Sequence, residues 1–173
     1  MNKKKILAIS GSIQSNSVNK SIIKYITGSF DQEVMFDIYN QLDKLPHFNP
    51  DLDKDDPPEI IQNLRQQIDN ADAVLICTPE YVFSLPGVLK NLIDWNVSSP
   101  VLINKPIGLI VAAASGQKAM ESLDLILSTV QAIIVGKLIV NGAKGKIGKN
   151  GVIQDQKTQL QINAFMSQFI KRI

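Results

Sequence analysis

The sequence has 173 residues, of which 45% are hydrophobic and 20% are charged, a length and mixture typical of one globular domain. Such a chain buries roughly 70% of the surface that its unfolded form exposes, which excludes a disulfide-stapled mini-protein and argues against a disordered chain. The net charge is only +2, and the two arginines, Arg65 and Arg172, lie far apart. The sequence therefore lacks the clustered basic surface of a nucleic-acid-binding protein.

Cys77 and His47 are the only cysteine and histidine, so an intrachain disulfide is impossible and we expect no metal site. Cys77 lies in an apolar run, where thiols are usually inert. The N-terminal apolar run covers only residues 6–9, whereas a signal peptide needs ~7–15 apolar residues. No stretch approaches the ~20 apolar residues of a membrane span. We therefore expect a cytoplasmic protein that does not associate with membranes.

Short apolar runs alternate along the chain with stretches of helical periodicity. The runs at 6–9 and 73–77 are typical of strands buried on both faces. Pro57, Pro58 and Glu59 then indicate the start of a helix, because proline and an acid are favoured in a first turn. The remaining expected elements are strands at 34–38, 107–113 and 137–140, and helices around 20–28, 86–95, 117–130 and 162–173. Residues 142–151, rich in glycine and lysine, are expected to be a mobile, solvated loop, the alternative being that Lys144, Lys146 and Lys149 contact an anionic partner.

Strands that alternate with helices predict a parallel sheet with helices on both faces. Crossovers are nearly always right-handed, and five strands favour the order 2-1-3-4-5 within one domain of residues 1–173. Ligands bind to such sheets at the carboxyl ends of the strands, between the first and third strands. The loops after residues 9, 77 and 113 should therefore form one site.

The first of these loops, residues 11–19, lies between a strand and the N-terminus of a helix. Free backbone N–H groups and the helix dipole make that position suitable for an anion. Ser12, Ser17 and Asn19 add short donors. Neither a Walker loop nor a dinucleotide-binding fingerprint has this spacing. The loop is therefore either a site for one terminal phosphate or a polar turn with a helix cap.

The second loop, residues 79–87, combines rigidity with aromatic side chains. Pro79 and Pro86 stiffen it, while Tyr81 and Phe83 stand where water should reach them. Beside a phosphate site, such a loop suits a flat, partly apolar ring that carries a phosphate tail. The alternative is that the two aromatic residues belong to the core or to an interface.

Taken together, the two loops form a pattern that is specific enough to indicate one protein family. They read Gly11-Ser12-x-x-x-x-Ser17-x-Asn19 and Pro79-Glu80-Tyr81-x-x-Ser84-x-Pro86-Gly87-x-x-Lys90-Asn91-x-x-Asp94-Trp95. With Leu45-Pro46-x-Phe48-Asn49-Pro50-Asp51, this pattern resembles the NADPH-dependent FMN reductase family, which includes quinone, azo-dye and chromate reductases. The resemblance implies a three-layer flavodoxin-like α/β sandwich, FMN as cofactor, NADPH or NADH as electron donor, and a homodimer or homotetramer.

The resemblance also implies roles for individual residues. The FMN phosphate would be held by residues of the first loop: Ser10, Ser12, Gln14, Ser17, Val18 and Asn19. The isoalloxazine ring would be lined by residues of the second loop: Pro79, Glu80, Tyr81, Val82 and Phe83. Ser115 and Gly116 would close its other side. Lys90, Asn91, Asp94 and Trp95 would shape the following helix and a subunit interface, with Lys90 and Asp94 paired at i, i+4.

The sequence departs from the family pattern at two informative positions. Gln14 stands where the family commonly has arginine, and Lys20 is a partial substitute because an ammonium group lacks the guanidinium fork. Val82 stands where the family commonly has asparagine. The third loop, residues 114–117, also has fewer glycines than is usual in the family.

The sequence contains no acid–base cluster, so we expect no catalytic side chain and assign the chemistry to the flavin. The hypothesis is a ping-pong transfer of hydride from reduced nicotinamide to a small acceptor: a quinone, an azo compound, chromate or free flavin. Backbone N–H groups near Tyr81 and Ser115 would stabilise the negative charge that develops on the reduced ring. Two alternatives are an FMN-binding electron carrier and a flavin-free regulatory descendant of the fold.

An acidic motif in the connection after the second expected strand resembles a calcium site only weakly. Asp51-x-Asp53-x-Asp55 begins like a calcium-binding EF-hand loop. The sixth position, however, is Asp56 rather than glycine, and the twelfth is Gln62 rather than glutamate. We therefore expect a solvated acidic loop.

Overall fold

The computed structural model describes residues 3–148 and 150–173. Its five strands form one parallel sheet in the order β2-β1-β3-β4-β5, which confirms the predicted topology. The strands are β1 (Lys5–Ser10), β2 (Met35–Tyr39), β3 (Ala73–Thr78), β4 (Pro106–Ala113) and β5 (Ile133–Asn141).

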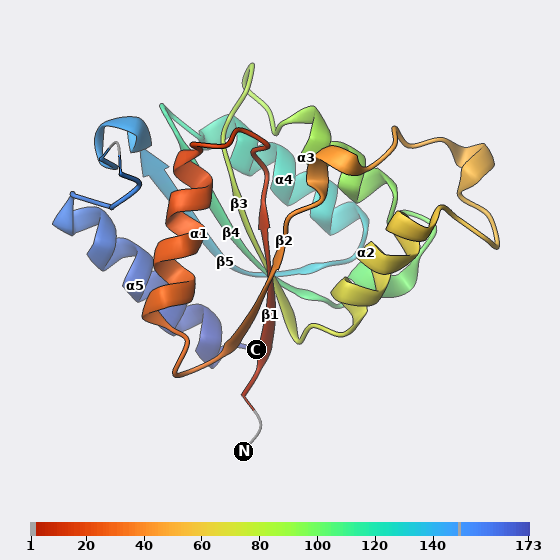
Figure 1. The fold of residues 1–173 in the computed structure, drawn as a ribbon, viewed down its shortest axis with the longest axis horizontal. Helices are drawn as coiled ribbons and strands as arrows, with labels where there is room; N and C mark the ends of the chain where they lie inside the picture. The colour runs from red at the N-terminus through yellow and green to blue at the C-terminus, as the bar shows by residue number, and fades with distance from the viewer. Residues whose placement is uncertain (1–2, 149) are drawn as a thin grey trace.

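Helices cover both faces of the sheet, so the molecule has three layers (Figure 1). Helices α1 (Val18–Ser29) and α5 (Gln156–Lys171) lie on one face. Helices α2 (Glu59–Asp69), α3 (Gly87–Asp94) and α4 (Gln117–Thr129) lie on the other. Within the described residues, no helix is both long and apolar enough to cross a membrane.

The apolar runs in β1 and β3 are continuous because each strand serves two cores. Along β1, Leu7 and Ile9 pack under α2, α3 and α4, whereas Ile6 and Ala8 pack under α1 and α5. All four side chains are at most 1% exposed. Side chains alternate across a strand, so a strand between two helical layers needs an apolar residue at every position.

Strand β5 begins at Ile133, four positions before the predicted start at residue 137. The prediction was wrong because Gly136 and Lys137 interrupt the apolar pattern. A Cβ atom at position 136 would lie 2.9 Å from the Phe165 ring of α5, so helix packing explains the glycine. β5 is also an edge strand, whose exposed residues weaken a pattern that relies on burial.

The segment after β5 is more ordered than the solvated loop that we expected. Ala143–Gly145 forms a turn of 3₁₀ helix, and Ile147 forms an antiparallel bridge with Ile153. Ala143 and Ile153 are each 2% exposed and belong to the core under α1 and α5. These anchors hold the segment at the carboxyl end of the sheet.

Two residues of the second motif anchor the connection between β2 and α2. The Asn91 side chain accepts from the Phe48 N–H at 2.8 Å and donates to the Pro46 carbonyl at 2.9 Å. The Trp95 indole N–H donates to the same carbonyl at 2.8 Å. Trp95 is fully buried within its own chain, so its own contribution is to the core and to this connection.

The expected i, i+4 pair between Lys90 and Asp94 is present at 2.5 Å. The acidic connection, in contrast, is only partly a solvated loop. The Asp53 carboxylate is 4% exposed and accepts a 2.7 Å hydrogen bond from the Arg65 guanidinium. Arg65 also donates to Ser98, so the connection is fixed to α2 and to the segment after α3.

Candidate functional site

The loops after β1, β3 and β4 meet at one end of the sheet, at the top of Figure 1. Together with the segment after β5, they enclose a cavity of about 490 Å³, which we call the carboxyl-end cavity. The structure brings seven of the predicted site residues to its wall: Ser12, Gln14, Ser17, Val18, Asn19, Pro79 and Tyr81. The wall also includes Asn16, Ala112–Ala114 and Gly142–Gly145, which the sequence analysis did not assign to the site.

The loop after β1 is held by its own short side chains. The Ser10 hydroxyl donates to the Ser12 carbonyl at 3.1 Å, and the Ser12 hydroxyl accepts from the Gln14 N–H at 3.4 Å. Ser17 is the N-cap of α1 and accepts from the Asn19 N–H at 3.2 Å. Ser12, Ser17 and Asn19 are at most 4% exposed. The helix N-terminus therefore faces the cavity from a fixed loop and suits an anion.

Gly11 lets this loop lie directly on β3. Its N–H donates to the Cys77 carbonyl at 2.8 Å. A Cβ atom at position 11 would lie 2.2 Å from Oγ1 and 2.6 Å from Cβ of Thr78, which is fully buried. The buried Thr78 side chain therefore leaves room only for glycine at position 11.

Cys77 contributes to the site from below the loop. Its thiol donates to the Asn19 side-chain oxygen at 3.4 Å, and burial raises the pKa of the thiol. Because that oxygen is occupied, the Asn19 amide group can present its N–H donors to an anion. The sequence analysis treated Cys77 as an inert core residue, although Cys77 ends the apolar run that leads into the second loop; the structure pairs it with Ser10.

The loop after β3 ends in a tight turn that projects farther than its neighbours (Figure 1). Tyr81 and Ser84 exchange backbone hydrogen bonds of 2.9 and 3.0 Å, which leaves Val82 and Phe83 at the tip. The φ angles of Val82 and Phe83 are 50° and 57°, a region that disfavours β-branched and bulky residues. Val82 is 96% and Phe83 74% exposed, so these two predicted site residues lie outside the cavity wall.

The turn also uses the backbone N–H of Tyr81. Because this N–H donates to the Ser84 carbonyl, it is not available to stabilise charge on a bound ring, and the prediction of N–H donors near Tyr81 does not extend to Tyr81 itself. The Tyr81 side chain lines the cavity and is 51% exposed. Its contribution to the site is therefore the ring rather than the amide.

Glu80 connects the second loop to the third. Its carboxylate accepts from the Ala119 N–H at 3.0 Å, in the first turn of α4. The N-cap of α4, Gly116, has no side chain to do this and has a φ of 92°. Glu80 thus caps α4 from another loop, and neither it nor Ser115 or Gly116 lines the cavity.

Lys144 supplies the positive charge of the cavity wall. It belongs to the 3₁₀ turn after β5, whereas Lys20 donates to the Ile13 carbonyl at 3.4 Å and lines a different pocket. Lys20 therefore does not take the place of the missing arginine at position 14. The rule that ligands bind at carboxyl ends, applied to the fifth strand as well, would have found Lys144.

The composition of the cavity wall indicates its chemistry. One end carries a helix N-terminus, hydroxyl groups, an amide and a lysine, which fit a phosphate. The other end, with Pro79, Tyr81 and Ala112–Ala114, is apolar and fits a flat ring. The volume lies in the ~300–1,000 Å³ range of organic ligand sites. Only Tyr81 and Lys144 among the lining residues are titratable, so the side chains offer no carboxylate or imidazole base. A phosphorylated redox cofactor such as FMN matches this arrangement.

Comparisons with known proteins agree with this geometry. Residues 4–146 match the family model of the NADPH-dependent FMN reductases. The chain is 31% identical to a 2-hydroxy-1,4-benzoquinone reductase of a Burkholderia species, over 95% of this chain and 93% of that protein. It is 28% identical to an NADPH azoreductase of Bacillus sp. strain OY1-2, over 94% and 93%.

Similarity extends to solved structures. A flavoenzyme NAD(P)H:(acceptor) oxidoreductase from Paracoccus denitrificans superposes with a TM-score of 0.79 and 26% identity, covering 97% of this chain and 96% of that one. The flavodoxin-like fold expected from the sequence is thereby confirmed.

Proposed function

The chain belongs to the NADPH-dependent FMN reductase family, and on that premise we propose that it binds FMN in the carboxyl-end cavity and reduces a small acceptor with NADPH or NADH. The observation that carries the proposal is the meeting of a phosphate-binding end and an apolar end in one cavity. Residues 1–173 would act as one FMN-binding domain. Quinones, azo compounds, chromate and free flavin are the candidate acceptors, and similar proteins are named for the first two classes.

The phosphate end would select FMN over riboflavin. Ser12, Ser17 and Asn19 would donate to the phosphate beside the N-terminus of α1, where negative charge is favoured. Lys144 would neutralise part of the phosphate charge from the opposite wall. Because the loop after β1 is already fixed by internal hydrogen bonds, little ordering entropy would be lost on binding.

The ring end would orient the cofactor between Pro79, Tyr81 and Ala112–Ala114. When bound, FMN supplies the hydride chemistry, and the protein supplies binding, orientation and electrostatics. Since donor and acceptor must reach the same ring, we propose that they bind in turn, in a ping-pong order.

Two measurements test this proposal. The purified protein should show the visible spectrum of a flavin after FMN is added and excess is removed. Steady-state oxidation of NADPH or NADH with a benzoquinone should give parallel lines in double-reciprocal plots. A protein that neither retains FMN nor oxidises either nucleotide would contradict the proposal, and intersecting lines would contradict the ping-pong order.

The role of Lys144 has its own test. Lys144→Met should weaken FMN about tenfold, as expected for one charge-assisted contact, while riboflavin affinity stays unchanged. Lys20→Met is the matched control, because Lys20 lines the other pocket. Equal loss of FMN affinity in both variants would contradict the assignment of Lys144.

A second copy of the chain would complete the site. Val82 and Phe83 expose apolar surface next to Tyr81, which lines the cavity, and a homodimer, or a homotetramer built from it, would cover them. Phe83→Asp should then shift the protein toward monomers in analytical ultracentrifugation. Because the proposed electron donors are cytoplasmic nucleotides, we also propose a cytoplasmic location, which cell fractionation would test.

A further inference from the structure

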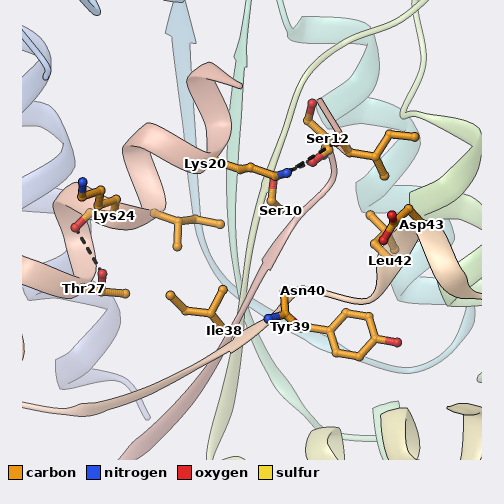
Figure 2. Close-up of a pocket in the computed structure, with 12 residues that line it drawn as sticks. Ser10, Ser12, Lys20, Lys24, Thr27, Ile38, Tyr39, Asn40, Leu42 and Asp43 are labelled. Carbon is orange, nitrogen blue, oxygen red and sulfur yellow. Dashed lines mark hydrogen bonds between the residues drawn. The ribbon is translucent and has the colours of Figure 1, made fainter. Parts of the chain in front are cut away.

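A second pocket lies on the other side of the loop after β1. It measures about 460 Å³, close to the volume of the carboxyl-end cavity. Its walls come from α1, from edge strand β2 and from the residues that follow β2 (Figure 2). We call it the α1–β2 pocket. Nothing in the proposed flavin chemistry uses it.

The loop after β1 separates the two cavities. Ser12 lines both of them, whereas Ile13 and Lys20 line only the α1–β2 pocket, and Asn19 and Ser17 line only the carboxyl-end cavity. A ligand in the α1–β2 pocket would therefore lie behind the phosphate-binding loop. It would not compete with FMN for space.

The interior of the α1–β2 pocket is apolar. Ile38 extends from β2 toward α1, with the Tyr39 ring on the other side of the strand (Figure 2). Ile23 lies on the α1 wall, and Leu42 and Ile13 complete the apolar lining. Ile38 and Ile13 are 51% and 52% exposed, so two aliphatic side chains meet water here. An apolar ligand body would cover them favourably.

Two lysines place positive charge on the α1 wall. Lys20 and Lys24 stand one turn apart, an arrangement that destabilises a helix when both are charged. In the part of the chain that the structure describes, neither has a carboxylate within 4.0 Å. Asp43 is the acidic residue of the lining, on the far side of Ile38 from Lys24 in Figure 2. An anion would therefore lie toward α1.

We propose that the α1–β2 pocket is a binding site for a small amphipathic organic anion, an aromatic ring system that carries a sulfonate or carboxylate. The ring system would pack on Ile38 and Ile23, and the acidic group would face Lys20 and Lys24. The volume is sufficient for a ligand of this class. Charge complementarity selects this occupant over a neutral or cationic one.

Isothermal titration calorimetry with 8-anilinonaphthalene-1-sulfonate as the probe tests the proposal. Titrations are run on the protein alone and on the protein saturated with FMN. With FMN bound we expect one probe per chain, and without FMN a site of similar affinity persists beside the empty carboxyl-end cavity. Ile38→Glu should weaken the probe at least about tenfold, because it places a carboxylate in the apolar interior. Lys24→Gln should weaken it several-fold.

Met35→Glu is the matched control for Ile38→Glu. Met35 lies on the same strand and is 54% exposed, but it does not line the pocket, so its variant should bind the probe like the wild type. Lys144→Met, in the carboxyl-end cavity, should also leave the probe affinity unchanged. This titration is run without FMN, so its result tests the α1–β2 pocket whether or not the protein binds FMN as proposed.

Four results would overturn the proposal. They are no binding to the wild type, displacement of the probe by FMN, equal affinity in Ile38→Glu and the wild type, and loss of affinity in Met35→Glu. Circular dichroism of each variant establishes that it is folded. Sedimentation of the wild type gives its oligomeric state, and a dimer that does not bind the probe would also contradict the proposal.

Discussion

The loops after β1 and β3 reach the same cavity but are built in opposite ways. The first consists of short polar residues that are buried and bonded to one another. The second ends in an exposed apolar turn whose backbone is strained at Val82 and Phe83. A phosphate needs fixed donors, which one chain can provide by itself. A flat ring needs apolar cover, and the exposed turn leaves that cover to a ligand or to another chain.

The largest expected effect comes from breaking the contact between the first loop and β3. Gly11→Ala should lower the free energy of unfolding by about 2–3 kcal/mol, because the new methyl group overlaps buried Thr78. It should also weaken FMN more than about 100-fold, since the loop must move away from its phosphate-binding position. Urea denaturation and flavin fluorescence titration measure the two effects.

Gly28→Ala is the control for this variant. A Cβ atom at position 28, within α1, meets nothing within 4 Å, so helix propensity should raise stability by about 0.5–1 kcal/mol. If Gly11→Ala raised the free energy of unfolding as Gly28→Ala does, close packing on β3 would not determine the conformation of the first loop.

The next effect concerns the thiol beneath the first loop. Burial raises the pKa of Cys77, so the folded protein keeps a proton that the unfolded chain releases above pH about 8.5. Stability should therefore be fully present below that pH and should fall above it by up to about 1.4 kcal/mol per pH unit. Denaturation of the wild type and Cys77→Ser between pH 7 and 9.5 isolates this contribution. An identical pH dependence in both proteins would contradict it.

A smaller effect should follow from separating the second loop from α4. Glu80→Leu removes the acceptor for the Ala119 N–H and should destabilise the protein by about 1 kcal/mol, as loss of a helix cap does. FMN affinity should fall as well, because the loop also carries Tyr81. Glu80→Gln retains a side-chain oxygen and should recover part of both losses. Glu121→Gln, in an exposed pair on α4, serves as the control and should change stability little.

The smallest expected effect comes from relieving backbone strain in the second loop, the feature that distinguishes it from the first. Val82→Asn should raise the free energy of unfolding by about 0.5–1 kcal/mol, because asparagine tolerates a φ of 50° better than valine does. Thermal denaturation measures the change, and Val97→Asn, at another exposed valine, is the control. A stability below that of the wild type would show that the turn is not strained at this position. The structure thus offers a backbone reason for asparagine in the family pattern.

Much of the fold could be predicted because it depends on local patterns. The apolar runs of β1 and β3, the prolines and acid before α2, and the loops between them indicated the sheet order and the end that binds ligands. The family motif pointed to the residues of the first loop, and the structure places Ser12, Ser17 and Asn19 on one cavity wall. The edge strand β5 was predicted less well, because exposure on an edge blurs the periodicity.

The sequence by itself determined the alternation of elements and the chemical character of each loop, because both depend on residues close together in the chain. Only the tertiary structure decided which side chains share a cavity. It brought Lys144 to the phosphate end, turned Glu80 toward α4, placed Cys77 under Asn19 and moved Lys20 to a separate pocket. These contacts join residues far apart in sequence, and their distances depend on how helices and strands pack rather than on local pattern.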